Sequence, residues 1–341
     1  MLVLSSWSGS TQAQEPYRPL GPVRGVIRVW GNETMAGIVR RWSERFVRYH
    51  PGARIEARML GGDVAMGALT TGKADIALLG REAAPQEVKG FEWIYRYPPS
   101  AIEVLNGSLD NPGCSPALAV LVHRSNPLSS LTLAQLDGLF SLDLRGGGKE
   151  SLRIWGQLGL SSEWAGRAIR LYSPDTETGT GVFFRNAALG GTRKLNWERL
   201  MEVEDSTGPG APSHDAGRKL AALVADDPNG LAVAPLSAPL PMDVHVVALA
   251  VREGEAAVLP TRESLLARRY PLGRVVRAYV NAAPEKPVDP KMARPLDRGV
   301  AEFLSYVLST EGQGVAATEG NYLPLGREAD AQLTRLRSLL R

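Results

Sequence analysis

Three short loops carry the residues with the clearest potential for chemistry. They are GNETM (31–35), GGDVAM (61–66) and TETGTGVFF (176–184), and each stands between an apolar, strand-like run and a run with helical periodicity. Backbone N–H groups in the first turn of a helix lack partners within the helix and lie at the positive end of its dipole. Each loop therefore predicts a place where an oxyanion can be held without a matching full charge.

Each loop, taken alone, also fits an ordinary structural role. Asp63 is expected as the N-cap of the helix that follows it, although it could also accept a proton from a ligand. Arg81 follows the apolar run ADIALLG (74–80) and could pair bidentately with an oxyanion. It could equally form an ion pair with Glu82 or with another carboxylate of a cleft. The sequence leaves these alternatives open.

The elements that must position these loops alternate between strand and helix. Residues 25–31 predict a strand, 35–49 a helix with one apolar face, and 53–60 a second strand. A glycine turn and a short helix over 61–73 then lead to the continuous apolar run at 74–80, which is typical of a strand covered on both faces. The order βαβαβ favours an α/β fold, in which ligands bind outside the carboxyl ends of strands.

Composition narrows the class of protein. The chain has 341 residues, 44% hydrophobic and 22% charged, which is enough for two globular domains. No apolar run approaches the ~20 residues that span a membrane. The net charge is +3, and basic residues are spread along the chain without clustering among aromatics, so nucleic-acid binding gains no support.

The first residues suggest export. Residues 1–14 begin apolar, become small and polar, and place Thr11 and Ala13 at the −3 and −1 positions of a signal-peptide cleavage site. We therefore expect residues 1–14 to be the remnant of a signal peptide and the protein to be periplasmic. A disordered N-terminal tail is the alternative.

Several motifs together resemble one known family. The segments IRVWGNETM, GARIEARMLGGDVAMGALTTGKADIALLGRE, LTLAQLDGLF, TETGTGVFF and FLSYVLSTEGQGVAATEGNYLPL occur in the same order as in the phosphate-binding component of bacterial phosphate ABC transporters. The resemblance extends over residues 25–325. It implies a type II periplasmic binding protein: two α/β lobes that close over a ligand in the cleft between them.

The resemblance also implies an organisation and a partner. We expect lobe I to comprise residues 25–110 plus 240–330 and lobe II residues 111–239, with strand-like crossings near Ala117 and Val244. The implied ligand is inorganic phosphate or a similar oxyanion, with no cofactor. An ABC permease is the implied protein partner, and a monomer is expected.

The family's ligand contacts carry over in part. Asn32, Thr34 and Met35 occupy the first loop, and Thr178-Gly179-Thr180 match the family's Ser-Gly-Thr. Gly62 and Asp63 stand where the family has serine beside glycine. Gly80-Arg81 match half of the family's Ser-Arg variant, and Pro174 replaces an arginine.

A carboxylate in the site would select phosphate, because hydrogen phosphate can donate a proton to it and sulfate cannot. The acidic residues near the loops are candidates for this role, although they also fit solvated loop charges: Glu33, Asp63, Glu82, Asp175 and Glu177.

Catalysis finds little support in the sequence. Of the four histidines, only His214 stands where it could face the cleft, and Gly-x-Ser-x-Gly and metal-ligand spacings are absent. We therefore expect a binding protein, not an enzyme. A sensory or scaffolding module of the same fold, or a receptor for a different small anion, remains an alternative.

Overall fold

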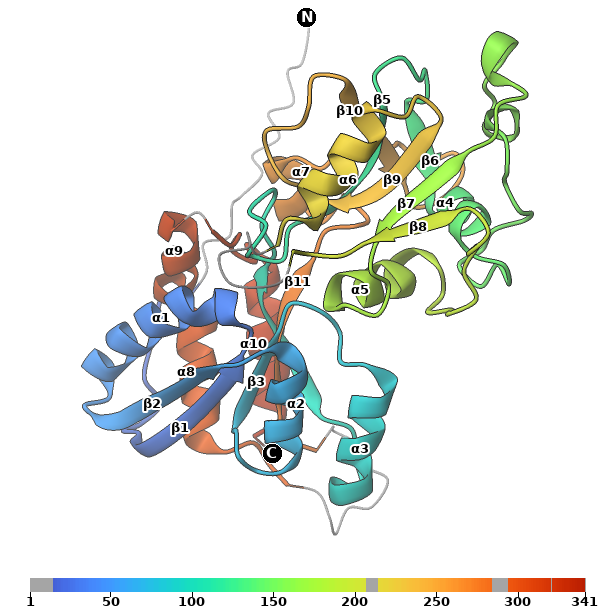
Figure 1. The fold of residues 1–341 in the computed structure, drawn as a ribbon. Helices are drawn as coiled ribbons and strands as arrows, with labels where there is room; N and C mark the ends of the chain where they lie inside the picture. The colour runs from blue at the N-terminus through green and yellow to red at the C-terminus, as the bar shows by residue number, and fades with distance from the viewer. Residues whose placement is uncertain (1–14, 207–213, 284–293, 320, 341) are drawn as a thin grey trace, which may run out of the picture.

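The computed structural model describes residues 15–206, 214–283, 294–319 and 321–340. Figure 1 shows two α/β lobes: the blue-to-cyan elements, the orange β11 and the red helices build one, and most of the green, yellow and light-orange elements build the other. The sheet of lobe I has the order β2 (Gly52–Met59), β1 (Arg24–Gly31), β3 (Ile76–Leu79), β11 (Val275–Val280), β4 (Ser100–Asn106). The sheet of lobe II has the order β6 (Ser130–Thr132), β10 (Val244–Ala250), β5 (Leu118–His123), β9 (Gly230–Pro235), β7 (Arg170–Pro174), β8 (Leu200–Val203).

Lobe I follows the predicted βαβαβ pattern. β1 pairs in parallel with β2 and β3, so the loops after β1 and β3 meet at one edge of the sheet. All four residues of β3 are buried, as its continuous apolar run predicts, because apolar clusters cover both of its faces. The helices of this lobe are η1 (Glu33–Met35), α1 (Ala36–Tyr49), α2 (Gly62–Thr70), α3 (Pro85–Tyr95), α8 (Arg298–Leu308), α9 (Thr310–Glu319) and α10 (Glu328–Ser338).

Lobe II is a mixed sheet with its own apolar core. β7 runs parallel to β8 and β9, whereas β5 runs antiparallel to β9 and β10. The loop after β7 contributes residues to a cavity that Asn32 and Thr34 of the first lobe also line. The helices here are α4 (Leu133–Phe140), η2 (Trp155–Leu158), η3 (Ser162–Trp164), α5 (Gly179–Ala188), α6 (Ala216–Ala225) and α7 (Arg262–Leu266).

The return from lobe II to lobe I comes later in the chain than expected. The boundary at residue 240 is wrong, because β10 pairs with β5 and β6 inside the second sheet. The chain crosses near Leu272–Arg274 and enters the first sheet as β11. There the two crossings run side by side: Gly107 N–H donates to Arg274 O (2.7 Å), and Leu118 N–H donates to Leu272 O (3.1 Å).

The N-terminal segment before β1 is anchored in lobe I by a buried polar chain. Val23 N–H donates to Nδ1 of His50 (3.2 Å), so Nε2 carries the ring proton and faces the Tyr17 hydroxyl (2.6 Å). That hydroxyl donates to Oε1 of Glu302 (2.7 Å). Burial lowers the pKa of His50, which keeps the imidazole neutral.

Among the described residues, no helix is long and apolar enough to cross a membrane. The expected signal-peptide remnant, residues 1–14, lies outside the described residues.

Candidate functional site

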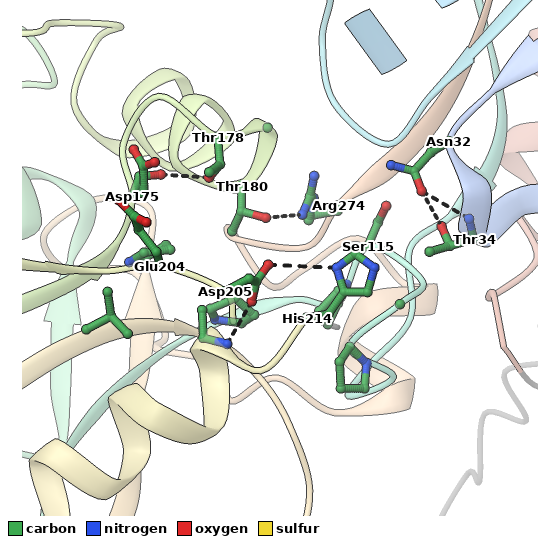
Figure 2. Close-up of a pocket in the computed structure, with 18 residues that line it drawn as sticks. Asn32, Thr34, Ser115, Asp175, Thr178, Thr180, Glu204, Asp205, His214 and Arg274 are labelled. Carbon is green, nitrogen blue, oxygen red and sulfur yellow. Dashed lines mark hydrogen bonds and ion pairs between the residues drawn. The ribbon is translucent and has the colours of Figure 1, made fainter. Parts of the chain in front are cut away.

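A cavity of about 220 Å³ lies between the lobes, where the loop after β1 faces the loop after β7. Figure 2 shows Asn32 and Thr34 on one side and Thr178 and Thr180 on the other, with Arg274 between them. Five predicted site residues line this cavity: Asn32, Thr34, Thr178, Gly179 and Thr180. Residues about 145 positions apart in the chain thus share one small polar space.

In the first loop, Asn32 caps the short η1 helix. Its Oδ1 accepts from the backbone N–H of Thr34 (3.1 Å) and from the Thr34 hydroxyl (2.9 Å), and its carbonyl accepts from Met35 N–H (3.0 Å). The N–H groups expected to be free at Thr34 and Met35 are therefore bound within the turn. The Thr34 hydroxyl also lies 3.1 Å from the Tyr322 hydroxyl. To donate to an anion, the Thr34 hydroxyl must give up its hydrogen bond to Asn32 Oδ1.

The loop after β7 has backbone N–H groups for which the described residues supply no acceptor. Thr178 is the N-cap of α5: its hydroxyl donates to Asp175 O (2.6 Å) and accepts from Gly181 N–H (3.2 Å). The next two N–H groups, of Gly179 and Thr180, are in the first turn of the helix, where no intrahelical acceptor exists. Both residues line the cavity. This loop therefore presents the positive end of α5 to the space between the lobes.

Arg274 supplies the positive charge of the cavity. Nη1 donates to the Thr180 hydroxyl (3.1 Å) in lobe II, while Nε (3.1 Å) and Nη2 (2.8 Å) donate to the carbonyl of Gly80 in lobe I. The residue is 8% exposed, and the guanidinium stacks over the Phe183 ring, 5.3 Å from its centroid. Burial, with a contribution from the Arg81 charge, lowers the pKa of Arg274 to about 10. Within the described part of the chain, it forms no ion pair with a carboxylate.

Arg81 has the opposite environment. Its Nη1 and Nη2 donate to Oε2 (2.7 Å) and Oε1 (2.8 Å) of Glu87, and Nη2 also contacts Oδ1 of Asp63. Burial alone would lower the pKa of Arg81, but the hydrogen bonds and charges of Glu87 and Asp63 raise it overall. Two carboxylates thus neutralise this guanidinium, which lines a separate cavity of about 500 Å³ beside the first. Glu82, the partner considered from the sequence, contributes only its backbone carbonyl to Arg81 (2.8 Å).

The other predicted residues stand outside the first cavity. The N-cap of α2 is Gly61, so the expectation that Asp63 caps this helix is wrong; Asp63 is in its first turn, with a side chain 90% exposed. Met35 is 1% exposed and belongs to the apolar core of lobe I. Gly62 packs on β3, where a Cβ would lie 3.7 Å from Cγ of Leu79. None of these side chains lines the space that holds Arg274.

The position of Ser115 explains why residue 80, which follows β3, is a glycine. A Cβ on Gly80 would lie 2.1 Å from the Ser115 hydroxyl oxygen, so a serine at 80 cannot be accommodated without movement. Ser115 itself lines the cavity and comes from the first crossing segment. Its hydroxyl thus occupies the place of the missing side chain at 80. Neither Ser115 nor Arg274 belongs to a motif, so nothing local in the sequence marks them.

Acidic side chains and one histidine also line the cavity. Asp175, Glu204 and Asp205 come from lobe II, and His214 lies with its Nδ1 3.9 Å from Oδ2 of Asp205. His214 does face the cleft, as its place in the sequence suggests. No group of three or more His, Cys, Asp or Glu in the described ranges could hold a metal ion.

This geometry can be compared with known proteins. A family model described as a PBP superfamily domain matches residues 13–311. The phosphate-binding protein PstS of Pseudomonas aeruginosa is 31% identical over 309 residues, which cover 91% of this chain and 86% of that protein. The chain belongs to the PBP superfamily and, within it, to the PstS family. The SphX protein of Synechococcus elongatus is 25% identical over 327 residues, covering 94% of this chain and 83% of SphX.

Solved structures agree on the fold. An ABC-type phosphate transport receptor from Vibrio cholerae superposes with a TM-score of 0.56 at 17% identity, covering 88% of this chain and all of that one. PstS from Borrelia burgdorferi also gives 0.56, at 12% identity, covering 88% of this chain and 99% of its own. The two-lobed type II fold expected from the sequence is confirmed. At these identities the structures describe the architecture of a PstS-family protein and not its individual contacts.

Proposed function

We propose that this protein binds inorganic phosphate in the cavity between its lobes and delivers it to an ABC importer. One observation carries the proposal: Arg274 is a buried cation whose polar contacts are a carbonyl and a hydroxyl, with no carboxylate partner among the described residues. A buried charge without a counter-charge is costly, and a bound oxyanion would supply the missing counter-charge. The N–H groups of Gly179 and Thr180 converge on the same space.

The cavity's carboxylates favour phosphate over sulfate. Asp175, Glu204 and Asp205 line the same space as Arg274. Hydrogen phosphate can donate its proton to a carboxylate, whereas sulfate has no proton to donate and would be repelled. Asp63, considered for this role from the sequence, pairs with Arg81 in the neighbouring cavity. The proposed acceptor is therefore on lobe II.

The names of relatives support the same ligand. The Pseudomonas aeruginosa relative is named a phosphate-binding protein, and we extend that ligand to this chain. We further propose that the protein is exported to the periplasm, acts as a monomer, contacts an ABC permease and catalyses no reaction. Because the anion would touch loops of both lobes, its binding would favour the arrangement in which they converge.

Calorimetric titration tests the ligand. The purified protein should release or absorb heat with phosphate, respond much more weakly to sulfate, and not respond to acetate. If it shows neither heat nor a thermal shift with millimolar phosphate, the ligand proposal fails. Phosphate uptake by cells that lack the gene tests delivery separately: tight binding together with unchanged uptake would favour a sensory or scaffolding module.

A further inference from the structure

His214 lies on the lobe II side of the cavity between the lobes. Its ring lines the cavity, and its side chain is 43% exposed. A Cβ added to Gly113 would lie 3.4 Å from Cγ2 of Thr34 and 3.9 Å from Cδ2 of His214. The histidine of lobe II and the threonine of lobe I therefore both lie near Gly113. Figure 2 shows the ring joined to Asp205 within the cavity lining.

Hydrogen bonds join residues 205–206 to residues 215–216, next to His214. Oδ1 of Asp205 accepts from the N–H of Ala216 (2.8 Å). Oδ1 and Oδ2 of Asp215 accept from the N–H (2.7 Å) and the hydroxyl (2.6 Å) of Ser206. The hydrogen bonds from Ser206 lower the pKa of Asp215 to about 2, so this clamp persists through the physiological range.

The conformation of His214 is itself unusual. Its φ is +58°, in the left-handed region that non-glycine residues rarely adopt. Such strain persists only where surrounding contacts impose it, and it is common at ligand sites. Here the hydrogen bonds between 205–206 and 215–216 lie next to this residue, whose side chain lines the cavity.

We propose that His214 is an anion-contacting residue of this site, whose imidazolium form strengthens phosphate binding. This inference rests on the proposed function. Nε2 of His214 has no partner among the described residues, and Nδ1 is held beside Asp205, which leaves Nε2 to donate to the ligand. The remaining charges that face the cavity are those of Arg274, Asp175, Glu204 and Asp205.

The sign of the pH effect follows from this set of charges. The guanidinium of Arg274, with a pKa of about 10, keeps its charge between about pH 5.5 and about pH 8, whereas histidine side chains in general change charge in this interval. Protonation adds one positive charge next to the anion, so His214 should contribute most to affinity at the acidic end. By linkage, the bound anion should in turn favour the protonated ring.

The test compares His214→Gln with the wild type by phosphate titration calorimetry at about pH 5.5 and about pH 8. Glutamine retains a hydrogen-bond donor but cannot become charged. Phosphate also titrates in this range, so the variants are compared with each other at the same pH. His123→Gln is the matched control, because His123 is at the end of β5, pairs with Ser125 and does not line the cavity.

We expect His214→Gln to weaken phosphate binding about tenfold or more at the acidic pH and less than about threefold at the alkaline pH. His123→Gln should match the wild type at both. Equal affinities of His214→Gln and wild type at both pH values would overturn the proposal, and so would an equal loss at both. If the wild type binds no phosphate at either pH, the proposed function itself fails, and this outcome is distinct from the first two.

Discussion

Replacing Arg274 by methionine gives the sharpest test of the site. A guanidinium has five N–H groups, and three of those of Arg274 donate to Gly80 O and Thr180 Oγ1, which leaves two for an anion. Each hydrogen bond between charged partners contributes about 1.5–3 kcal/mol. Losing both should cost about 3 kcal/mol or more, which is over a hundredfold in the dissociation constant for phosphate.

The same substitution should leave the folded protein largely intact. It removes three hydrogen bonds, but it also removes a buried cation that has no counter-charge among the described residues. These effects oppose each other, so the melting temperature without phosphate should change little. Arg274→Lys should bind with intermediate affinity, because an ammonium keeps the charge but lacks the planar fork that pairs with two oxygens.

Calorimetry with phosphate, together with thermal unfolding with and without phosphate, measures both effects. Arg277→Met is the matched control: Arg277 lies on β11, just after Arg274 in the chain, but it pairs with Glu82 and Glu103, away from the cavity. Arg277→Met should bind phosphate like the wild type. A folded Arg274→Met protein with wild-type affinity would refute the assignment of Arg274 to the anion.

Three further outcomes follow from the structure. Arg81→Gln should change phosphate affinity less than about threefold in calorimetry, because two carboxylates already neutralise this guanidinium; a loss above about tenfold would contradict this. Gly80→Ala should destabilise the fold by about 1–3 kcal/mol in urea unfolding, since the added methyl meets the Ser115 hydroxyl. Adding Ser115→Gly should restore stability, and its failure to do so would exclude this clash as the cause. Because burial lowers the pKa of His50, the unfolded chain binds more protons, and stability should be constant above about pH 6.5 and decline as the pH falls. Urea unfolding across this range should show a flatter profile for His50→Gln; an unchanged profile would assign the pH dependence to other groups.

The local elements of lobe I follow from the sequence because their patterns are local. The apolar face of the helix predicted at 35–49 is buried in α1, through Ile38, Val39, Trp42 and Phe46. The apolar run ending at Leu79 forms β3, which is covered on both faces. Motif order also identified the family, since loops that open helices after strands recur at fixed places along such a chain.

Pairing between distant strands could not be predicted in this way. The run at 244–250 is apolar enough for either sheet, and only its register with β5 assigns it to lobe II. That assignment moves the return crossing to Leu272–Arg274, next to the first crossing at Gly107. The predicted boundary at residue 240 was wrong for this reason.

The electrostatics of the two arginines were likewise decided by the tertiary structure. The sequence by itself determined that Arg81 follows β3 and that Thr178-Gly179-Thr180 begins a helix, because both depend on neighbours in the chain. It carried no signal that Glu87 and Asp63 neutralise Arg81, or that Arg274 bridges Gly80 and Thr180 with no carboxylate partner in the described part of the chain. The charge available to a ligand depends on which groups surround a guanidinium in space, and those groups come from parts of the chain up to 194 residues away.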